Sequence, residues 1–526
     1  MALEQTVVQQ LDPQVRSYIK NLESEHRNLE ARYEVLEEKY RLLLFKRFSR
    51  SSEQDSPQQQ LFEESEQTAE TMWDTEGTSE TVTVEAHQRK KRGRKPIDQS
   101  VPRVDILHDI DESQKRCACG HTMVRIGEEI SERMQVIPAQ MYAERHIRPK
   151  YACRHCEGSG DEEKPAVRLA PAPPSILPGS IVTPGLLAFI LVNKFVDHLP
   201  FYRQEARFER LGIHISRQDM SNWAIGVARK LVPLIELFED RIRGGPFIQM
   251  DETPVQVLRE PERAATTKSY MWLACGGPAG APVCLYHYAE TRGPQYAQSL
   301  LEDYSGFVQA DAYGVYARIA EAQPGITLVG CWAHARRKFH EAARASKKAG
   351  AAQEAISRIK KLYQVEKELR AKDLSPAAFL AARKKQVNPV LESFKQWLAR
   401  KSETVVPSTL LGKAVGYTLK EWDRLVGYLG APDLTPDNNA AERAIRPFVL
   451  GRKNWLFSGS PRGATSSCAI YSIIETGKQN GLDPYAYLHH IFTTVPLITD
   501  EAEWENLLPE SLDVEHVNKA FLAALR

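Results

Sequence analysis

Apolar residues recur every seven positions near the start of the chain. The first position of this repeat is aliphatic throughout, at Val15, Leu22, Leu29, Leu36 and Leu43. The second position is mixed, with Ile19, His26, Tyr33 and Tyr40. Heptads sustained over this length predict one helix at residues 11–45 that pairs with a second copy as a leucine-zipper-like coiled coil. A single amphipathic helix packed on the body of the protein is the alternative. We assign residues 1–48 to this segment.

The heptad pattern gives way to blocks of charge. Residues 51–88 hold ten Asp or Glu and no Lys or Arg, whereas residues 89–95 hold six Lys or Arg. Few apolar residues occur there, so residues 49–100 are expected to form a disordered acidic linker that ends in a basic run. That run contains Arg92, Arg94 and Lys95 around a glycine and resembles an AT-hook, which binds the minor groove of DNA. A basic run that binds phosphates without sequence preference is the alternative.

Four of the eight cysteines form two close pairs, Cys117 with Cys119 and Cys153 with Cys156. Two such pairs in a chain this poor in cysteine predict a tetrahedral structural Zn²⁺ site. His155 is an alternative ligand. We expect a few short strands between the pairs, at residues 123–147, within a zinc-binding module at residues 101–165.

A proline-rich stretch then leads into a helical region at residues 166–245. Helices are expected at residues 201–211 and 216–230, joined by a turn that contains glycine, which is the helix-turn-helix pattern. Ser216 is expected to cap the second helix. DNA contacts would then come from the exposed side of that helix, from Arg217, Gln218, Ser221 and Asn222. A helical hairpin without a DNA-binding role is the alternative.

From residue 246 the apolar period changes to that of strands. Strands are expected at residues 247–257, 269–274, 282–288, 307–310 and 327–330, and helices at residues 293–301 and 332–344. This order predicts an α/β fold with a mixed sheet and resembles a ribonuclease-H-like core. The core would comprise residues 246–345 and 431–526, interrupted by a helical insertion at residues 346–430 that is rich in Lys, Arg, Ala and Leu.

Two aspartates lie where such a core offers a metal site. Asp251 falls within the first strand, and Asp311 directly follows the fourth. A carboxylate among apolar strand residues is unfavourable unless it binds a partner. The alternatives are an ion pair between Asp251 and a buried arginine, and a helix-capping role for Asp311.

The third candidate carboxylate is Glu442. It lies on a helix that we expect to begin with Thr435 as its cap and Pro436 at its first position. Asn438, Asn439, Glu442 and Arg446 would then share one face. Three carboxylates suit two Mg²⁺ or Mn²⁺ ions, which catalyse phosphodiester chemistry. An exposed Glu–Arg pair is the alternative.

Basic residues near these carboxylates in the sequence are candidates for contacts with DNA phosphates: Arg336, Arg337, Lys338, Arg443, Arg446, Arg452 and Lys453. Trp455 is a candidate for stacking on an unpaired base, with a place in the core as the alternative.

Several stretches are similar to the insertion-sequence-66 family of bacterial transposases. They are residues 249–253, 310–313, 330–339, 437–447, 451–457, 474–476 and 484–488. The resemblance implies a DNA transposase with Asp251, Asp311 and Glu442 as its DDE triad. It also implies cleavage at the ends of a mobile element, strand transfer into target DNA, and accessory proteins of the same element. The alternatives are a catalytically silent DNA-binding regulator and a structure-selective nuclease of the same fold.

The sequence also bears on the oligomeric state and the cellular location of the protein. The heptads favour a homodimer or a higher oligomer. The chain shows no secretory signal, and its longest apolar run is too short to span a membrane, so we expect a bacterial cytoplasmic, nucleoid-associated protein.

Overall fold

The computed structural model describes residues 12–48, 105, 107, 131, 141–152, 167–345 and 350–524. The chain divides into two units, one of residues 1–69 and 173–526 and one of residues 70–172. In the second unit, β1 (Lys150–Ala152) pairs antiparallel with β2 (Val167–Leu169). The described part of residues 123–147 contains no strand, which differs from our expectation there. The basic run and all four paired cysteines lie outside the described residues.

The expected N-terminal helix is present as α2 (Pro13–Phe48). Its heptad seam faces solvent: Leu29 is 63% exposed and Leu36 is 65% exposed. The helix contacts the body of the protein through a different side, where Glu38 accepts a 3.0 Å hydrogen bond from the backbone amide of Leu410. The packing of α2 on the body therefore leaves the seam uncovered.

Four helices precede the sheet: α4 (Pro184–Phe195), α5 (Phe201–Arg210), α6 (Arg217–Lys230) and α7 (Val232–Arg243). α5 ends one residue before its expected end, and α6 begins one residue after its expected start. As expected, Ser216 caps α6: its hydroxyl oxygen accepts a hydrogen bond from the backbone amide of Asp219. Met220 is buried in a small core with Ile190, Phe208 and Ile215. Arg217, Gln218 and Asn222 are exposed on α6, whereas Ser221 is half-buried.

A five-stranded mixed sheet forms the centre of this unit, in the order β5-β4-β3-β6-β7. β3 (Phe247–Gln256), β4 (Lys268–Gly276) and β5 (Val283–Ala289) form an antiparallel meander. β6 (Gly306–Gln309) pairs parallel with β3, and β7 (Ile326–Val329) pairs parallel with β6. The parallel strands are joined through α8 (Gln295–Leu300) and α9 (Gly314–Ala322), since a parallel connection needs a crossover. The expected mixed α/β sheet is confirmed.

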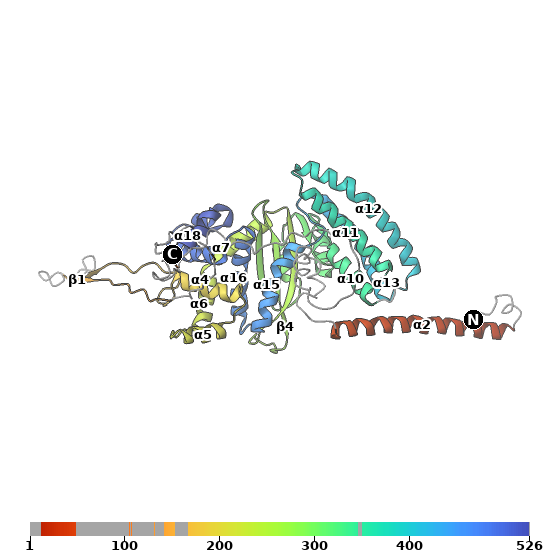
Figure 1. The fold of residues 1–526 in the computed structure, drawn as a ribbon, viewed down its shortest axis with the longest axis horizontal. Coiled ribbons are helices and arrows are strands. Elements are labelled where there is room, and N and C mark those ends of the chain that lie inside the picture. The colour runs from red at the N-terminus through yellow and green to blue at the C-terminus, as the bar shows by residue number, and fades with distance from the viewer. Residues whose placement is uncertain are drawn as a thin grey trace, which may run out of the picture. The chain divides into compact units, whose positions relative to one another are not determined.

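The expected insertion is helical. It comprises α11 (Gly350–Arg370), α12 (Pro376–Thr404), α13 (Leu410–Lys420) and α14 (Trp422–Val426), and it packs against α10 (Trp332–Ala345), which precedes it. These helices enclose a second core around Trp332, Phe339 and Phe394. In Figure 1 they lie on the opposite side of the sheet from α4, α5 and α6.

The chain then returns to the sheet with α15 (Asn439–Trp455) and α16 (Pro461–Gln479). α15 packs on β3 and β4, and α16 packs on β5 (Figure 1). α17 (Pro484–Thr494) and α18 (Val514–Ala524) complete the described chain. Across the described residues, no helix combines the length and apolar character required of a membrane span.

Candidate metal and DNA site

Three carboxylates come together at one edge of the sheet. Asp251 lies on β3, and Asp311 lies two residues beyond the end of β6. Because β3 and β6 are parallel neighbours with Gln249 opposite Gln309, Asp251 on β3 lies level with the carboxyl end of β6, where Asp311 follows. Glu442 comes from the first turn of α15, which packs on β3. Burial raises the pKa of Asp251 well above its usual value, and the nearby negative charges of Glu252, Glu442 and Asp311 raise it further.

Glu442 has the environment of a cation ligand rather than of a surface ion pair. Its residue is 3% exposed, and among the described residues neither carboxylate oxygen has a hydrogen-bond partner. Burial raises its pKa to about 7, although the charge of Arg337 lowers it. A buried carboxylate without a donor is unfavourable in the protein alone. Hard divalent cations such as Mg²⁺ bind carboxylate oxygens, so the residues present fit such an ion.

The two aspartates keep oxygens available for a ligand. One oxygen of Asp251 accepts a 2.9 Å hydrogen bond from the backbone amide of Glu252. No ion pair with an arginine is found for Asp251 among the described residues. Asp311 accepts a 2.9 Å hydrogen bond from the amide of Tyr313, which fixes the turn into α9.

Glu252 is a neighbouring carboxylate that the sequence analysis did not consider. Successive strand residues point to opposite faces, so its side chain points away from that of Asp251. Arg292 pairs with it, and the hydroxyl of Tyr316 donates to it at 2.9 Å. The Arg292 guanidinium also lies 4.0 Å from the centre of the Tyr313 ring. This network holds the loop after β6 against β3 and thereby fixes the position of Asp311.

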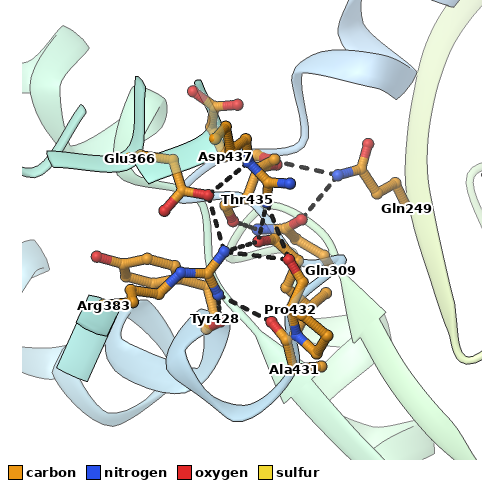
Figure 2. Close-up of polar contacts among 11 residues, drawn as sticks. Gln249, Gln309, Glu366, Arg383, Tyr428, Ala431, Pro432, Thr435 and Asp437 are labelled. Carbon is orange, nitrogen blue, oxygen red and sulfur yellow. Dashed lines mark hydrogen bonds and ion pairs between the residues drawn. The ribbon is translucent and has the colours of Figure 1, made fainter. Parts of the chain in front are cut away.

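The segment before α15 is held by a buried arginine of the helical insertion (Figure 2). Arg383 of α12 is fully buried and pairs with Glu366 of α11 at 2.8 Å. It donates to four backbone carbonyls of the segment, those of Tyr428, Ala431, Pro432 and Leu434. The insertion therefore sets where the chain enters α15 and the helix that carries Glu442.

The expected start of this helix was wrong. α15 begins at Asn439, with Asn438 in the capping position, and not at Thr435 and Pro436. Arg383 donates to the carbonyls of Pro432 and Leu434, and Gln309 donates to the carbonyl of Thr435. These carbonyls therefore make hydrogen bonds to distant side chains instead of to the backbone of a helix. The Thr435 hydroxyl instead donates to the carbonyl of Asp437. Hydrogen bonds to distant side chains, and not the local Thr-Pro sequence, therefore decide where α15 begins.

Two buried glutamines connect the three elements that carry the carboxylates (Figure 2). The side-chain amide of Gln249 on β3 donates to the side chain of Gln309 on β6 at 2.8 Å. Gln309 donates to the carbonyl of Thr435 at 2.8 Å, and Gln249 accepts from the amide of Ala441. Each glutamine precedes a site aspartate by two residues, a spacing visible in the sequence that we had not interpreted.

Basic side chains from α10 and α15 flank Glu442. Arg337 and Arg446 both lower the pKa of Glu442, which places their charges nearby. His334 lies in the first turn of α10, with its Nδ1 3.7 Å from a carboxylate oxygen of Glu442. Arg336 is half-buried and Arg443 is exposed on the same two helices. His334 was not among the site residues predicted from the sequence, although it lies close to Glu442.

Other candidate DNA contacts lie farther along α15. Trp455 is 13 positions beyond Glu442, roughly 20 Å along the helix at 1.5 Å per residue. It packs edge-on against Phe195 and lies under the ammonium of Lys194 at 4.8 Å. With Ser221 of α6 it lines a pocket of about 120 Å³. Arg452 reaches back to the hydroxyl of Thr253 at 3.3 Å, and Lys453 is exposed. The structure thus separates Trp455 from the three carboxylates.

Four protein-family models match the chain. Transposase IS66 family matches residues 179–466, and the zinc-finger binding domain of transposase IS66 matches residues 114–157. The IS66 C-terminal element matches residues 472–509. A leucine-zipper element described as Transposase C of IS166 homeodomain matches residues 35–106. The first match spans all three carboxylates, and the second spans the four paired cysteines.

The chain is also similar to proteins of Sinorhizobium fredii (strain NBRC 101917 / NGR234). Uncharacterized protein y4jD is 32% identical over 433 residues, which cover 80% of this chain and 82% of the relative. Uncharacterized protein y4hP is 29% identical over 437 residues, which cover 80% of this chain and 77% of the relative. Because one family model covers more than half of the chain and three more match its remaining parts, this protein belongs to the Transposase IS66 family and carries that family's DDE transposase domain.

Proposed function

We propose that this protein is a DNA transposase that binds the ends of an insertion sequence, cleaves the 3′ ends and joins them to target DNA. The observation that supports this most strongly is the meeting of Asp251, Asp311 and Glu442, of which Glu442 is buried and has no hydrogen-bond partner among the described residues. The strand order, with three antiparallel strands followed by two parallel ones, supports a ribonuclease-H-like core.

The three carboxylates would hold two Mg²⁺ or Mn²⁺ ions. Bound ions would stabilise charge on the scissile phosphate and activate the attacking oxygen. The protein's own contribution is to keep the carboxylates at one edge of the sheet, through the glutamine pair, the Arg292 network and the Arg383 contacts. Arg337 and Arg446 add positive charge next to Glu442, where the phosphate would lie.

The reaction has two steps. In the first, water attacks the phosphorus at the element end, the bond to the 3′ oxygen breaks, and that oxygen leaves as a 3′-hydroxyl. In the second, this hydroxyl attacks a phosphorus of target DNA and releases another 3′-hydroxyl. Neither step needs a covalent protein–DNA intermediate.

DNA would be bound at several further places. On α6 we assign contacts to Arg217, Gln218 and Asn222, which are exposed. In the basic run we assign them to Arg92, Arg94 and Lys95, around the carboxylates to Arg336, Arg337, Arg443 and Arg446, and at the far end of α15 to Arg452 and Lys453. Structural Zn²⁺ would be held by Cys117, Cys119, Cys153 and Cys156. The protein would form a homodimer through α2. It would also act with accessory proteins of the same element.

A strand-transfer assay tests the function directly. Purified protein, Mg²⁺ or Mn²⁺, a labelled element end and a target plasmid are incubated, and the junctions are sequenced. Wild type is expected to give joined products that disappear with Asp251→Asn while end binding persists. The matched control is Asp303→Asn, an exposed aspartate before β6, which should retain joining.

Two outcomes would contradict the proposal. End binding without cleavage or joining, even with the other proteins of the element present, would favour a silent DNA-binding regulator. Hydrolysed ends that are never joined would favour a structure-selective nuclease.

A further inference from the structure

Glu442 faces two other metal-binding side chains as well as the aspartates. Cys331 is the residue before α10, and His334 lies three positions later in the first helical turn. The ligand atoms of Cys331, His334 and Glu442 all lie within 4.8 Å of one another. Cys331 and Glu442 are buried, and His334 is half-buried.

Each of these groups has a lone pair that the protein leaves available. Among the described residues, Nδ1 of His334 and both oxygens of Glu442 are buried without a hydrogen-bond partner. Burial and the charges of Glu442 and Asp437 raise the pKa of the Cys331 thiol well above its usual value, although the backbone amides of Asn438 and His334 donate to its sulfur. A metal ion that binds here must therefore displace the thiol proton. The unpartnered groups of His334 and Glu442 are unfavourable in the protein alone, and a cation bound between them and the Cys331 sulfur would compensate both.

The donor set selects a particular class of metal. Thiolate and imidazole are ligands of Zn²⁺ and related transition metals, whereas Mg²⁺ prefers oxygen ligands alone. Zinc bonds of roughly 2.0–2.3 Å bring ligands to within about 4 Å of each other, so small side-chain rotations would close this site. Three protein ligands would leave a fourth position open.

We propose that Cys331, His334 and Glu442 form a transition-metal site of the zinc type, distinct from the cysteine module, that withdraws Glu442 from the Mg²⁺-binding carboxylates when it is filled. Asp311 and Asp437 lie near enough to act on this cluster and favour a cation there. Arg337 and Lys338 act on His334 with the opposite sign. The inhibitory consequence rests on the proposed function, whereas metal binding itself does not.

Cobalt absorption tests the site without relying on activity. Full-length protein is loaded with one equivalent of Zn²⁺, which the four thiolates of the cysteine module bind first, and is then titrated with Co²⁺. Wild type should develop a thiolate-to-cobalt charge-transfer band that saturates at one added equivalent and is abolished by further Zn²⁺. Cys331→Ser should lose the band, and His334→Ala should weaken Co²⁺ binding by at least about tenfold.

Two control variants keep the result interpretable. Cys468→Ser changes another buried thiol, on α16, and should keep the band. Asp251→Asn should also keep it, because Asp251 belongs to the other metal site. No band in wild type, or a band that survives Cys331→Ser, would overturn the proposal. A band that depends on Asp251 instead would place the cobalt among the aspartates and would overturn it too.

Strand transfer then separates this proposal from the proposed function. At fixed Mg²⁺, Zn²⁺ beyond the cysteine module's requirement should inhibit joining by wild type, and Cys331→Ser should require at least about tenfold more. Joining that is insensitive to Zn²⁺ would overturn the inhibitory role. If wild type never joins DNA while the band depends on Cys331 and His334, the transposase proposal fails and the metal site stands.

Discussion

Asp251 and Glu252 are adjacent in the chain, yet their carboxylates have different surroundings. Glu252 pairs with Arg292 and accepts from Tyr316, so its charge is compensated within the protein. Asp251 is half-buried with one backbone donor and lies near the carboxylates of Asp311 and Glu442. A carboxylate with charged and hydroxyl partners is tolerated in the fold, whereas one that faces other carboxylates is unfavourable unless a ligand binds it. At the scale of the residue, this difference marks the candidate site.

Replacing Glu442 should stabilise the protein in the absence of Mg²⁺. Burial raises the pKa of Glu442 from 4.5 to about 7 in the folded state. Because the folded pKa lies above the unfolded one, stability is lost as the pH rises from about 4.5 to about 7. Above pH 7 the loss is on the order of 3 kcal/mol, at 1.36 kcal/mol for each pKa unit. Glu442→Gln avoids this loss.

Thermal unfolding without added Mg²⁺ measures the effect. The melting temperature of Glu442→Gln should exceed that of wild type at pH 8, and the difference should shrink at pH 5. Adding Mg²⁺ should raise the melting temperature of wild type more than that of the variant. A variant less stable than wild type at pH 8 would show that the Glu442 carboxylate is compensated in the protein alone.

At the scale of the element, the helical insertion positions the segment that leads to the site. α11 and α12 supply Glu366 and Arg383, and Arg383 holds the carbonyls that precede α15 (Figure 2). Its planar guanidinium can donate to several acceptors at once, which a lysine cannot reproduce. The insertion thus supports Glu442 from a distance.

Arg383→Met should destabilise the protein by about 1–3 kcal/mol, because it leaves the carbonyls of Tyr428 and Ala431 without this donor. Arg370 still pairs with Glu366 and donates to the carbonyls of Pro432 and Leu434. Strand transfer should fall further than the loss of folded protein explains, since α15 would lose its fixed starting point. Urea unfolding and strand transfer are measured together. Lys384→Met, on the exposed neighbour, is the matched control. Full strand transfer by folded Arg383→Met would contradict this positioning role.

α6 presents an exposed polar side that is available to DNA. The side-chain amide of Gln218 donates to Asn222 at 3.1 Å, and Arg217 lies at the start of the same helix. Arg217→Ala should weaken binding to the element end by about tenfold or more if this helix reads DNA bases. Lys230→Ala, at the other end of α6, removes the same charge and should have a smaller effect. Equal effects, measured by fluorescence anisotropy, would indicate contact with phosphates only.

At the scale of the whole molecule, α2 carries a leucine seam that the described part of the chain leaves exposed to solvent. Leu29→Lys should dissociate the expected homodimer, because it places a charge in the paired interface. Ser24→Lys adds the same charge to an exposed position outside the seam and should leave the dimer intact. Light scattering gives the mass of each variant. A wild-type monomer, or a Leu29→Lys dimer, would contradict pairing through this seam.

The sequence by itself determined the elements and the family. The heptads predicted α2, the change of period at residue 246 predicted the strands, and Ser216 was correctly identified as a cap. These features are readable because helix and strand periodicity and capping depend on residues a few positions apart. The sequence likewise placed Asp251 within one strand and Asp311 directly after another, and β3 and β6 have these positions.

Only the tertiary structure decided how the site is supported and what else it contains. The start of α15 depends on Arg383, and the glutamine pair joins residues 60 positions apart. Cys331 and His334 show a suggestive spacing, but Glu442 is more than 100 positions further along the chain. Such contacts arise from packing between distant segments, and no local period encodes them. Polar groups with no partner in their own element take the partners that packing brings to them.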